Sequence, residues 1–209
     1  MITILLTVFA FTLFYIGIAT RLVSYIKMLV FQGILLFGIT FIELKDVNWI
    51  NLVLILLETI VFKTVAIPYF LSYLIKKNKI IREAEPFVSN FWSLLIITGL
   101  FLLSFILSGV LDFDKQSKIF VIVSFSTILT GLYIIISRKK VITHVMGYLV
   151  LENGVFILSL AVGSNQPMLV NLGVLLDVFV SVLVLGIFIN QIGNTFEEMT
   201  ADNLSNLKD

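Results

Sequence analysis

Long, unbroken apolar runs dominate this chain and decide most of what it can fold into. Several runs reach the roughly 20 residues that a bilayer-spanning helix needs, and they show no alternation of apolar and polar residues. Lipid offers no hydrogen-bond partners to the backbone, so only helices and closed barrels span it, and barrel strands alternate. The pattern therefore predicts membrane-spanning helices. With 59% apolar and 13% charged residues, the chain carries too much apolar surface for a soluble domain.

The runs predict an all-α, polytopic membrane protein with about seven transmembrane helices. The first boundary rests on the charged interruption from Arg21 to Lys27, because one helix from Met1 to Glu43 would be roughly 63 Å long, twice the bilayer core. A six-span alternative, in which the first segment lies at the membrane interface, stays open. The expected spans are residues 2–20, 22–42, 49–75, 90–111, 119–137, 141–163 and 168–190.

Basic residues predict the orientation of these helices, because loops rich in Lys and Arg stay in the cytoplasm. Seven spans place alternate loops on opposite sides, which predicts an N-terminus outside and a C-terminus in the cytoplasm. The N-terminus lacks a basic start and a cleavage site of small residues, so we expect a retained helix there. One side carries Arg21, Lys27, Lys76, Lys77, Lys79, Arg82, Arg138, Lys139, Lys140 and Lys208; the other carries Lys45, Lys115 and Lys118.

Loop lengths and composition predict four regions along the chain. The longest connection, KKNKIIREAEPFVS at 76–89, is the best boundary between two halves. A polar stretch ends the sequence and is expected in the cytoplasm. The expected regions are a three-helix membrane segment at 1–78, the fourth and fifth helices at 79–140, a helix pair at 141–192 and the tail at 193–209.

The polar composition excludes several classes of function. Net charge is only +1, so no nucleic-acid partner is expected. Cysteine is absent, which removes disulfides, iron–sulfur ligands and thiolate metal sites, and one histidine cannot build a metal centre alone. We therefore expect no catalytic centre and no bound cofactor in this chain, so any redox chemistry would take place on another chain.

Four charged residues lie well inside the expected spans: Glu58, Lys63, Glu152 and Asp177. Each costs roughly 2.5–3.5 kcal/mol at the centre of a membrane helix. Such residues face the interior of a helix bundle or a wet cavity and commonly mark ion or proton pathways. These four are the candidate functional residues.

The two acids occupy the middle of neighbouring expected spans. Glu152 lies in GYLVLENGVFILSL and Asp177 in NLGVLLDVFVSVLVLG, and the short connection GSNQP makes the two spans antiparallel neighbours. A carboxyl group in a low-dielectric medium can exchange its proton nearer neutral pH than one in water. The pair could pass a proton laterally through water. The structural alternative is an ion pair for Glu152 and a hydrogen bond to a neighbouring helix for Asp177.

The remaining candidates are less specific. Glu58 and Lys63 are five residues apart, which on an ideal α-helix points them about 140° apart. Pro68 frees the carbonyl of Thr64 and is expected to kink the helix beside Lys63. A buried lysine can join a proton relay or balance a partner's carboxylate. His144, roughly 12 Å along the helix from Glu152, could feed protons from the cytoplasm or have no specific role at the interface.

Two expectations concern ordinary structural uses of the remaining residues. The cluster of Arg138, Lys139 and Lys140 is expected to face lipid headgroups as a topology signal. Gly147 and Gly154 are expected to allow close approach of neighbouring helices.

Three blocks of sequence carry a resemblance to a known family. The stretches HVMGYLVLENGVFILSLA, NLGVLLDVFVSVLVLGIFI and ADNLSNLKD closely resemble the E subunit of hydrogenase 4, a membrane subunit of formate hydrogenlyase-type group 4 [NiFe] hydrogenase complexes. The spacing from Lys63 to Pro68 also looks like this family. The resemblance covers most of the chain and is strongest from His144 onward.

The last spans are in turn similar to the NuoK/MrpC-type subunits of respiratory complex I and Mrp antiporters, so region 141–192 reads as a NuoK/MrpC-like helix pair. Those subunits carry one carboxylate on each of two adjacent helices. Glu152 matches the first position and Asp177 the second, where complex I usually has Glu. The resemblance implies a lateral proton path linked to ion transport.

The resemblance also implies where this chain works and beside what. It implies a multi-pass protein of a prokaryotic inner membrane, beside antiporter-like and hydrogenase-proximal subunits, with NiFe and iron–sulfur centres on those partners. Two alternatives stay open: a structural subunit that assembles the membrane arm, and a component of an Mrp-type antiporter. A standalone transporter is disfavoured, because no inverted repeat is visible.

Overall fold

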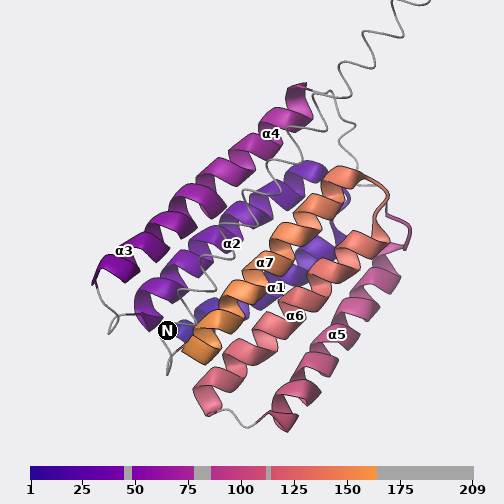
Figure 1. Cartoon of the computed structure of the whole chain (residues 1–209). Helices are drawn as coiled ribbons and strands as arrows, with labels where there is room; N and C mark the ends of the chain where they lie inside the picture. Colours follow the sequence, from indigo (N-terminus) through magenta and orange to yellow (C-terminus); the bar gives the residue numbers. More distant parts are fainter. Residues whose placement is uncertain (45–48, 78–85, 112–113, 164–209) are drawn as a thin grey trace, which may run out of the picture. The chain divides into compact units, whose positions relative to one another are not determined.

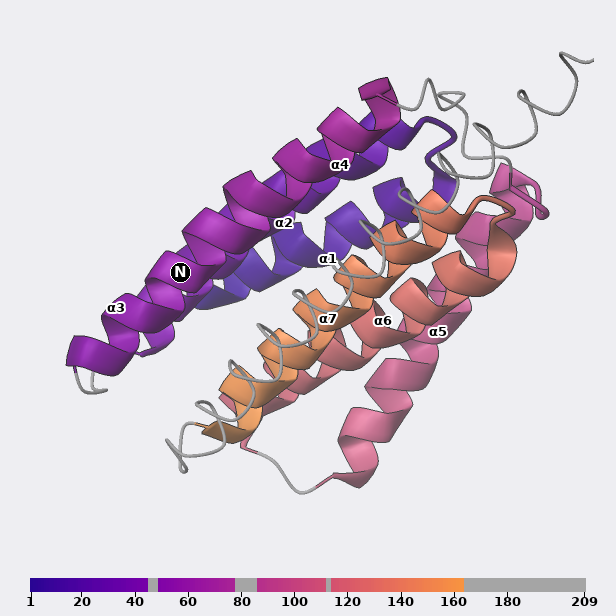
Figure 2. The same ribbon diagram turned by 45° about the horizontal axis from the view of Figure 1, so that its top comes forward.

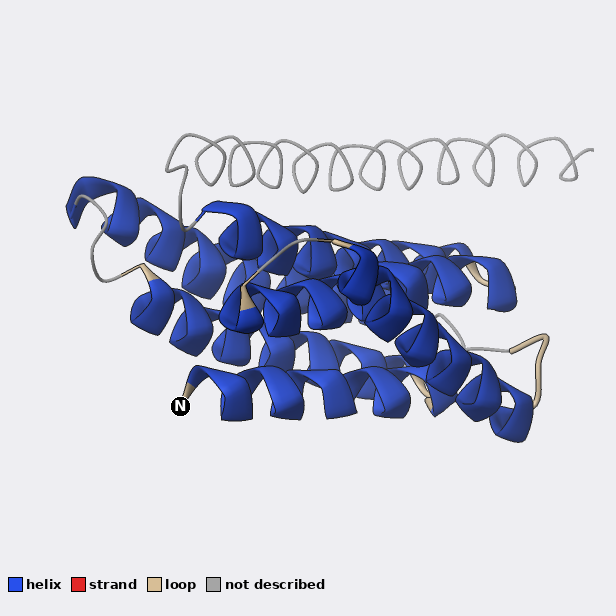
Figure 3. Cartoon of the chain, turned by 90° about the horizontal axis from the view of Figure 1, so that it is seen from below, coloured by secondary structure: helices blue, strands red, loops and turns tan. Residues whose placement is uncertain are grey.

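The computed structural model describes residues 1–44, 49–77, 86–111 and 114–163, all within one compact unit, Met1–Val174. Within these ranges the chain is helical, without a β-strand (Figures 1 and 3). The last expected span, residues 168–190, and the tail lie outside the described residues. The helices are α1 (Ile2–Ile18), α2 (Leu22–Glu43), α3 (Trp49–Glu58), the π-helix η1 (Thr59–Ala66), α4 (Ile67–Lys77), α5 (Asn90–Val110), α6 (Lys115–Ser137) and α7 (Val141–Gly163).

The helix bounds agree with the first six expected spans to within a few residues. Five described helical stretches are long and apolar enough to cross a membrane. The sixth, α1, has 17 residues and is roughly 26 Å long. The chain turns between Ala19 and Arg21, both with extended backbone, which confirms the expected break at the first boundary. The chain is a helical membrane protein, and its total number of spans and its orientation stay predictions.

Glycines bring α6 and α7 into backbone contact. These antiparallel helices are joined by three residues and lie side by side over their whole length (Figures 1 and 2). A Cβ atom added at Gly131 would lie 2.7 Å from the carbonyl oxygen of Gly147, and one at Gly154 would lie 2.8 Å from the backbone nitrogen of Ile128. The expected role of Gly147 and Gly154 in close packing is confirmed.

The middle of α2 lies where several helices meet. It packs against α1, α7 and η1, while α1 also packs against α5 and α6. Phe9 and Leu13 of α1 and Leu36 and Ile39 of α2 are fully buried in the shared core. This arrangement brings η1 and α7, which are far apart in sequence, to the same side of α2 (Figure 2).

Basic residues gather at one end of this helical unit. The ends of α1, α4 and α6 and the starts of α2 and α7 lie at that end (Figure 1). Arg21, Lys76, Lys77 and the cluster from Arg138 to Lys140 lie there. The alternating helix directions therefore group these basic residues as the sequence predicted.

Arg138 corrects one expectation about this basic end. Its side chain is only 1% exposed, whereas Lys139 is exposed, so Arg138 does not face lipid headgroups as predicted. The guanidinium donates a 2.6 Å hydrogen bond to the carbonyl of Gly17, near the end of α1, and lies 5.9 Å from the ring centroid of Tyr25. A cation suits this position because the last carbonyls of a helix have no partner within the helix and carry partial negative charge.

Replacing Arg138 with Met is expected to lower the free energy of unfolding by about 2 kcal/mol, because the buried Gly17 carbonyl loses a charge-assisted hydrogen bond. Denaturant unfolding of the purified chain in detergent measures the loss. Lys139→Met is the control, since it removes an exposed neighbouring cation that lies 5.3 Å from the ring centroid of Phe87, and it should cost less than about 1 kcal/mol. Equal losses of unfolding free energy in both variants would contradict a stabilising role for the hydrogen bond from Arg138 to the end of α1.

Candidate functional site

The helix that carries Lys63 is widened into a π-helix at that residue. Pro68, just downstream, lacks the N–H that would close an ordinary helical turn, and η1 spans the eight residues before α4. The hydroxyl of Thr64 donates to the carbonyl of Thr59, five residues back, at 3.1 Å, and the Thr59 hydroxyl donates to the carbonyl of Ile55 at 2.8 Å. The kink expected beside Lys63 stays a prediction. The structure shows a π-helix at this position, a feature frequent at functional sites.

The π-helix also changes the expected relation between Glu58 and Lys63. Their 140° separation assumed an ideal α-helix, but the chain is π-helical from Thr59 to Ala66, so that separation is wrong. Hydrogen bonds between residues five apart turn the chain by less per residue than an α-helix does. The backbone of Glu58 ends α3, and its side chain lies outside the described set.

Gly33 of α2 allows the π-helix to approach closely at Lys63. A Cβ atom at Gly33 would lie 2.6 Å from the hydroxyl oxygen of Thr64 and 3.3 Å from the carbonyl carbon of Lys63. Because glycine leaves this space open, the backbone of η1 packs directly on α2. The Lys63 side chain then reaches α7 and is 6% exposed.

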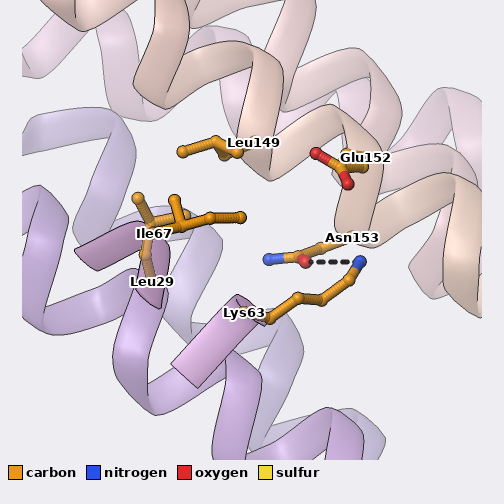
Figure 4. Close-up of a pocket in the computed structure, with 6 residues that line it drawn as sticks. All are labelled: Leu29, Lys63, Ile67, Leu149, Glu152 and Asn153. Atoms are coloured by element: carbon orange, nitrogen blue, oxygen red, sulfur yellow. Dashed lines mark hydrogen bonds between the residues drawn. The ribbon is translucent and has the colours of Figure 1, made fainter. Parts of the chain in front are cut away.

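Lys63 and Glu152 line the same pocket. Figure 4 shows the amine of Lys63 and the carboxylate of Glu152 pointing into the space between η1 and α7. Glu152 is 5% exposed. The pocket has room for about one water molecule. Three polar and three apolar residues line it: Lys63, Glu152, Asn153, Leu29, Ile67 and Leu149.

Neighbouring side chains on α7 hold the lysine amine in place. Nζ of Lys63 donates a 3.3 Å hydrogen bond to Oδ1 of Asn153, which lies 90 positions further along the sequence (Figure 4). The same amine lies 4.8 Å from the ring centroid of Phe156, a cation–π distance. Both contacts favour the charged ammonium in an otherwise apolar interior.

A chain of hydrogen bonds leads from this pocket across the unit to α1. Nδ2 of Asn153 donates to Oε1 of Gln32 on α2 at 3.1 Å, and Nε2 of Gln32 donates to the hydroxyl of Thr12 on α1 at 2.8 Å. The Thr12 hydroxyl donates to the carbonyl of Phe9 at 2.6 Å. Asn153, Gln32 and Thr12 are all buried. Four helical elements thus share one polar network.

Sequence reasoning missed Gln32 and Thr12 because it searched the spans for charge. Gln32 is an amide in the middle of an expected span, beside Gly33, in the stretch LVFQGILLF. A buried amide needs several hydrogen-bond partners, so this position carried a usable signal. Thr12 carried less, since a threonine in a membrane helix commonly bonds to its own helix.

The other predicted site residues lie elsewhere. His144, at the basic end, donates from Nε2 to the carbonyl of Arg138 at 2.8 Å and lies two turns of α7 before Glu152. Its expected role as a proton feed stays a prediction. Asp177 lies outside the described residues. Within the described part of the chain, no three His, Asp or Glu side chains come close enough together to hold a metal ion.

Comparison with known proteins reveals distant relatives. The chain is 26% identical over 187 residues to an uncharacterized protein of Mycobacterium tuberculosis. This alignment covers 88% of this chain and 85% of that protein. It is 25% identical over 148 residues to hydrogenase-4 component E of Escherichia coli K12. This alignment covers 70% of this chain and 68% of that protein. Hydrogenase-4 component E of Shigella flexneri shows the same values.

No family model and no solved structure matches the chain. The similarity to hydrogenase-4 component E is weak but runs over more than two thirds of both chains. It suggests the same family as the sequence blocks around Glu152 and Asp177 do, and it is compatible with a membrane subunit.

Proposed function

We propose that this chain is a non-catalytic integral membrane subunit of a group 4 hydrogenase or complex I-like oxidoreductase complex, and that its buried carboxylates form part of a lateral proton path. The observation that carries the proposal is the pocket in which Lys63 of η1 and Glu152 of α7 meet. Distant similarity to hydrogenase-4 component E supports the membership. In this proposal, the complex as a whole couples the redox reaction to ion transport.

The pocket has the chemistry that a proton relay needs. A proton that moves from the Lys63 ammonium to the Glu152 carboxylate, through a water between them, turns two buried charges into two neutral groups. Desolvation and attraction of a buried ion pair largely offset each other, so the two states can be close in free energy. A small input of charge from a neighbouring subunit then shifts the balance between them.

The path continues to the partners in this proposal. Asp177 takes the second carboxylate position of the NuoK/MrpC-like pair, and His144 lies on the route from the basic, cytoplasmic end. The N-terminus is outside and the C-terminus in the cytoplasm of a prokaryotic cell. Antiporter-like subunits lie on one side and the hydrogenase-proximal module on the other, and these partners hold the NiFe and iron–sulfur centres.

The alternative is a structural subunit of the membrane arm. The network from Lys63 to Thr12 supports this alternative, because it joins α1, α2, α7 and η1 through buried hydrogen bonds. In that case the buried charges are assembly contacts, and their removal disrupts the complex rather than its coupling.

Purification of the tagged chain from its native membranes tests the membership. We expect it to bring along [NiFe] hydrogenase-type large and small subunits and antiporter-like subunits in near-equal amounts, identified by mass spectrometry. An unrelated polytopic protein with the same tag is the control. Recovery of antiporter subunits without hydrogenase subunits would instead favour an Mrp-type antiporter, and recovery of neither would contradict the proposal.

A further inference from the structure

The hydrogen-bond chain from the pocket to α1 has a fixed direction. The Thr12 hydroxyl has one proton, and it donates this proton to the carbonyl of Phe9. Thr12 can therefore only accept from Gln32, which must turn its NH₂ group toward α1 and its Oε1 toward Asn153. Because the Phe9 carbonyl can only accept, every group along the chain has a single orientation that satisfies its neighbours.

Thr12, at the far end of the hydrogen-bond chain, determines which amide atom of Asn153 faces Lys63. With its NH₂ group committed to Gln32, Asn153 presents Oδ1, an acceptor, to the lysine amine. An ammonium has three donors and no acceptor, so it needs this orientation. If the amide turned over, its NH₂ group would oppose the ammonium and disfavour the charged lysine.

We propose that Gln32, held by Thr12, is a positioning residue for Lys63: it fixes Asn153 with its acceptor toward the pocket, and so keeps the Lys63 ammonium beside Glu152. This inference rests on the proposed function of the pocket. Gln32 and Thr12 act through Asn153. Amides neither gain nor lose protons near neutral pH, so the chain to α1 anchors the relay, and protons leave the pocket by another route.

Few other charged groups surround Lys63 in the described structure. On α7 the acid that shares the pocket is Glu152. On the helices packed against η1, Lys27 and Lys76 are exposed and Glu43 ends α2, while the side chains of Glu58 and Lys77 lie outside the described set. Within the pocket, the orientation of Asn153 therefore bears directly on the charge of Lys63 beside Glu152.

Thr12 offers a matched pair of variants. Thr12→Val removes the hydroxyl with little change of shape, so the Gln32 and Asn153 amides lose their fixed direction. Thr12→Ser keeps the hydroxyl and should restore it. In the intact complex, the alkaline limb of the pH profile of proton translocation should move down by about one pH unit in Thr12→Val, the loss of about one hydrogen bond to a charged group.

Thr127→Val is the control for this shift. Thr127 is also buried, lies on α6 and donates to the carbonyl of Val123 in its own helix, outside the network. It should leave the pH profile in place, as should Thr12→Ser. If Thr12→Val leaves the profile unmoved in a complex that translocates protons, or if all three variants move it equally, the positioning role is wrong.

A second measurement does not depend on proton translocation. Thr12→Val, Lys63→Met and the double variant form a double-mutant cycle of thermal stability. The two residues lie at opposite ends of the hydrogen-bond network. Coupling through Gln32 and Asn153 predicts that Thr12→Val lowers the Tm less when Lys63 is absent, by about 2–4 °C. Additive losses would overturn the positioning role. If Lys63→Met translocates protons normally, the proposed function fails, and the cycle alone decides the positioning role.

Discussion

Replacing Glu152 with Gln is expected to stop proton translocation in the assembled complex while electron transfer in its soluble arm continues. Glutamine has the same shape and can still hydrogen-bond in the pocket, but it cannot take up a proton from Lys63. Because positioned proton transfer contributes about 10²–10⁴-fold, translocation should fall by about 100-fold or more. Dye quenching in inverted membrane vesicles measures translocation, and hydrogen production measures electron transfer.

Glu43→Gln is the matched control for this experiment. Glu43 ends α2, is partly exposed and undergoes the same chemical change outside the pocket. It should retain translocation. Unchanged coupling in Glu152→Gln would contradict the relay role, and loss of the complex on a native gel would favour the assembly alternative. Asp177→Asn extends the test to the second carboxylate that the family resemblance implies.

Much of the fold could be predicted because lipid imposes a simple rule. Apolar runs long enough to span a bilayer must be helical, so the bounds of the described helices followed from the runs and from charged breaks such as Arg21. The role of Gly147 and Gly154 also followed, since small residues allow membrane helices to touch. These features depend on local sequence and on the solvent.

The candidate site was predictable in its charges and not in its contacts. Lys63 and Glu152 were found because charge is costly in lipid, yet their meeting depends on how η1 and α7 pack on α2. Helical periodicity failed at Thr59–Ala66, where the π-helix replaces the α-helix that the Glu58–Lys63 angle assumed. The prediction for Arg138 was wrong because a basic residue at a helix end usually contacts lipid headgroups, whereas Arg138 donates a hydrogen bond to the end of α1.

Replacing Gly131 with Ala is expected to have the largest effect on stability. The added Cβ would lie 2.7 Å from the carbonyl oxygen of Gly147 and 2.7 Å from the backbone nitrogen of Leu151. Both are backbone atoms, which cannot rotate away as a side chain can, so α6 and α7 must move apart. We expect a loss of about 3 kcal/mol in the free energy of unfolding, the upper range for overpacking, in detergent denaturation.

Gly99→Ala on α5 separates this crowding from the general effect of alanine in a helix. A Cβ at Gly99 meets no atom within 4 Å, so this variant should be neutral or more stable by up to about 1 kcal/mol. Similar losses in both variants would contradict the close α6–α7 contact. Since α7 carries both Glu152 and Asn153, displacing it in Gly131→Ala should also break the hydrogen bond to Lys63, so proton translocation should fall along with stability.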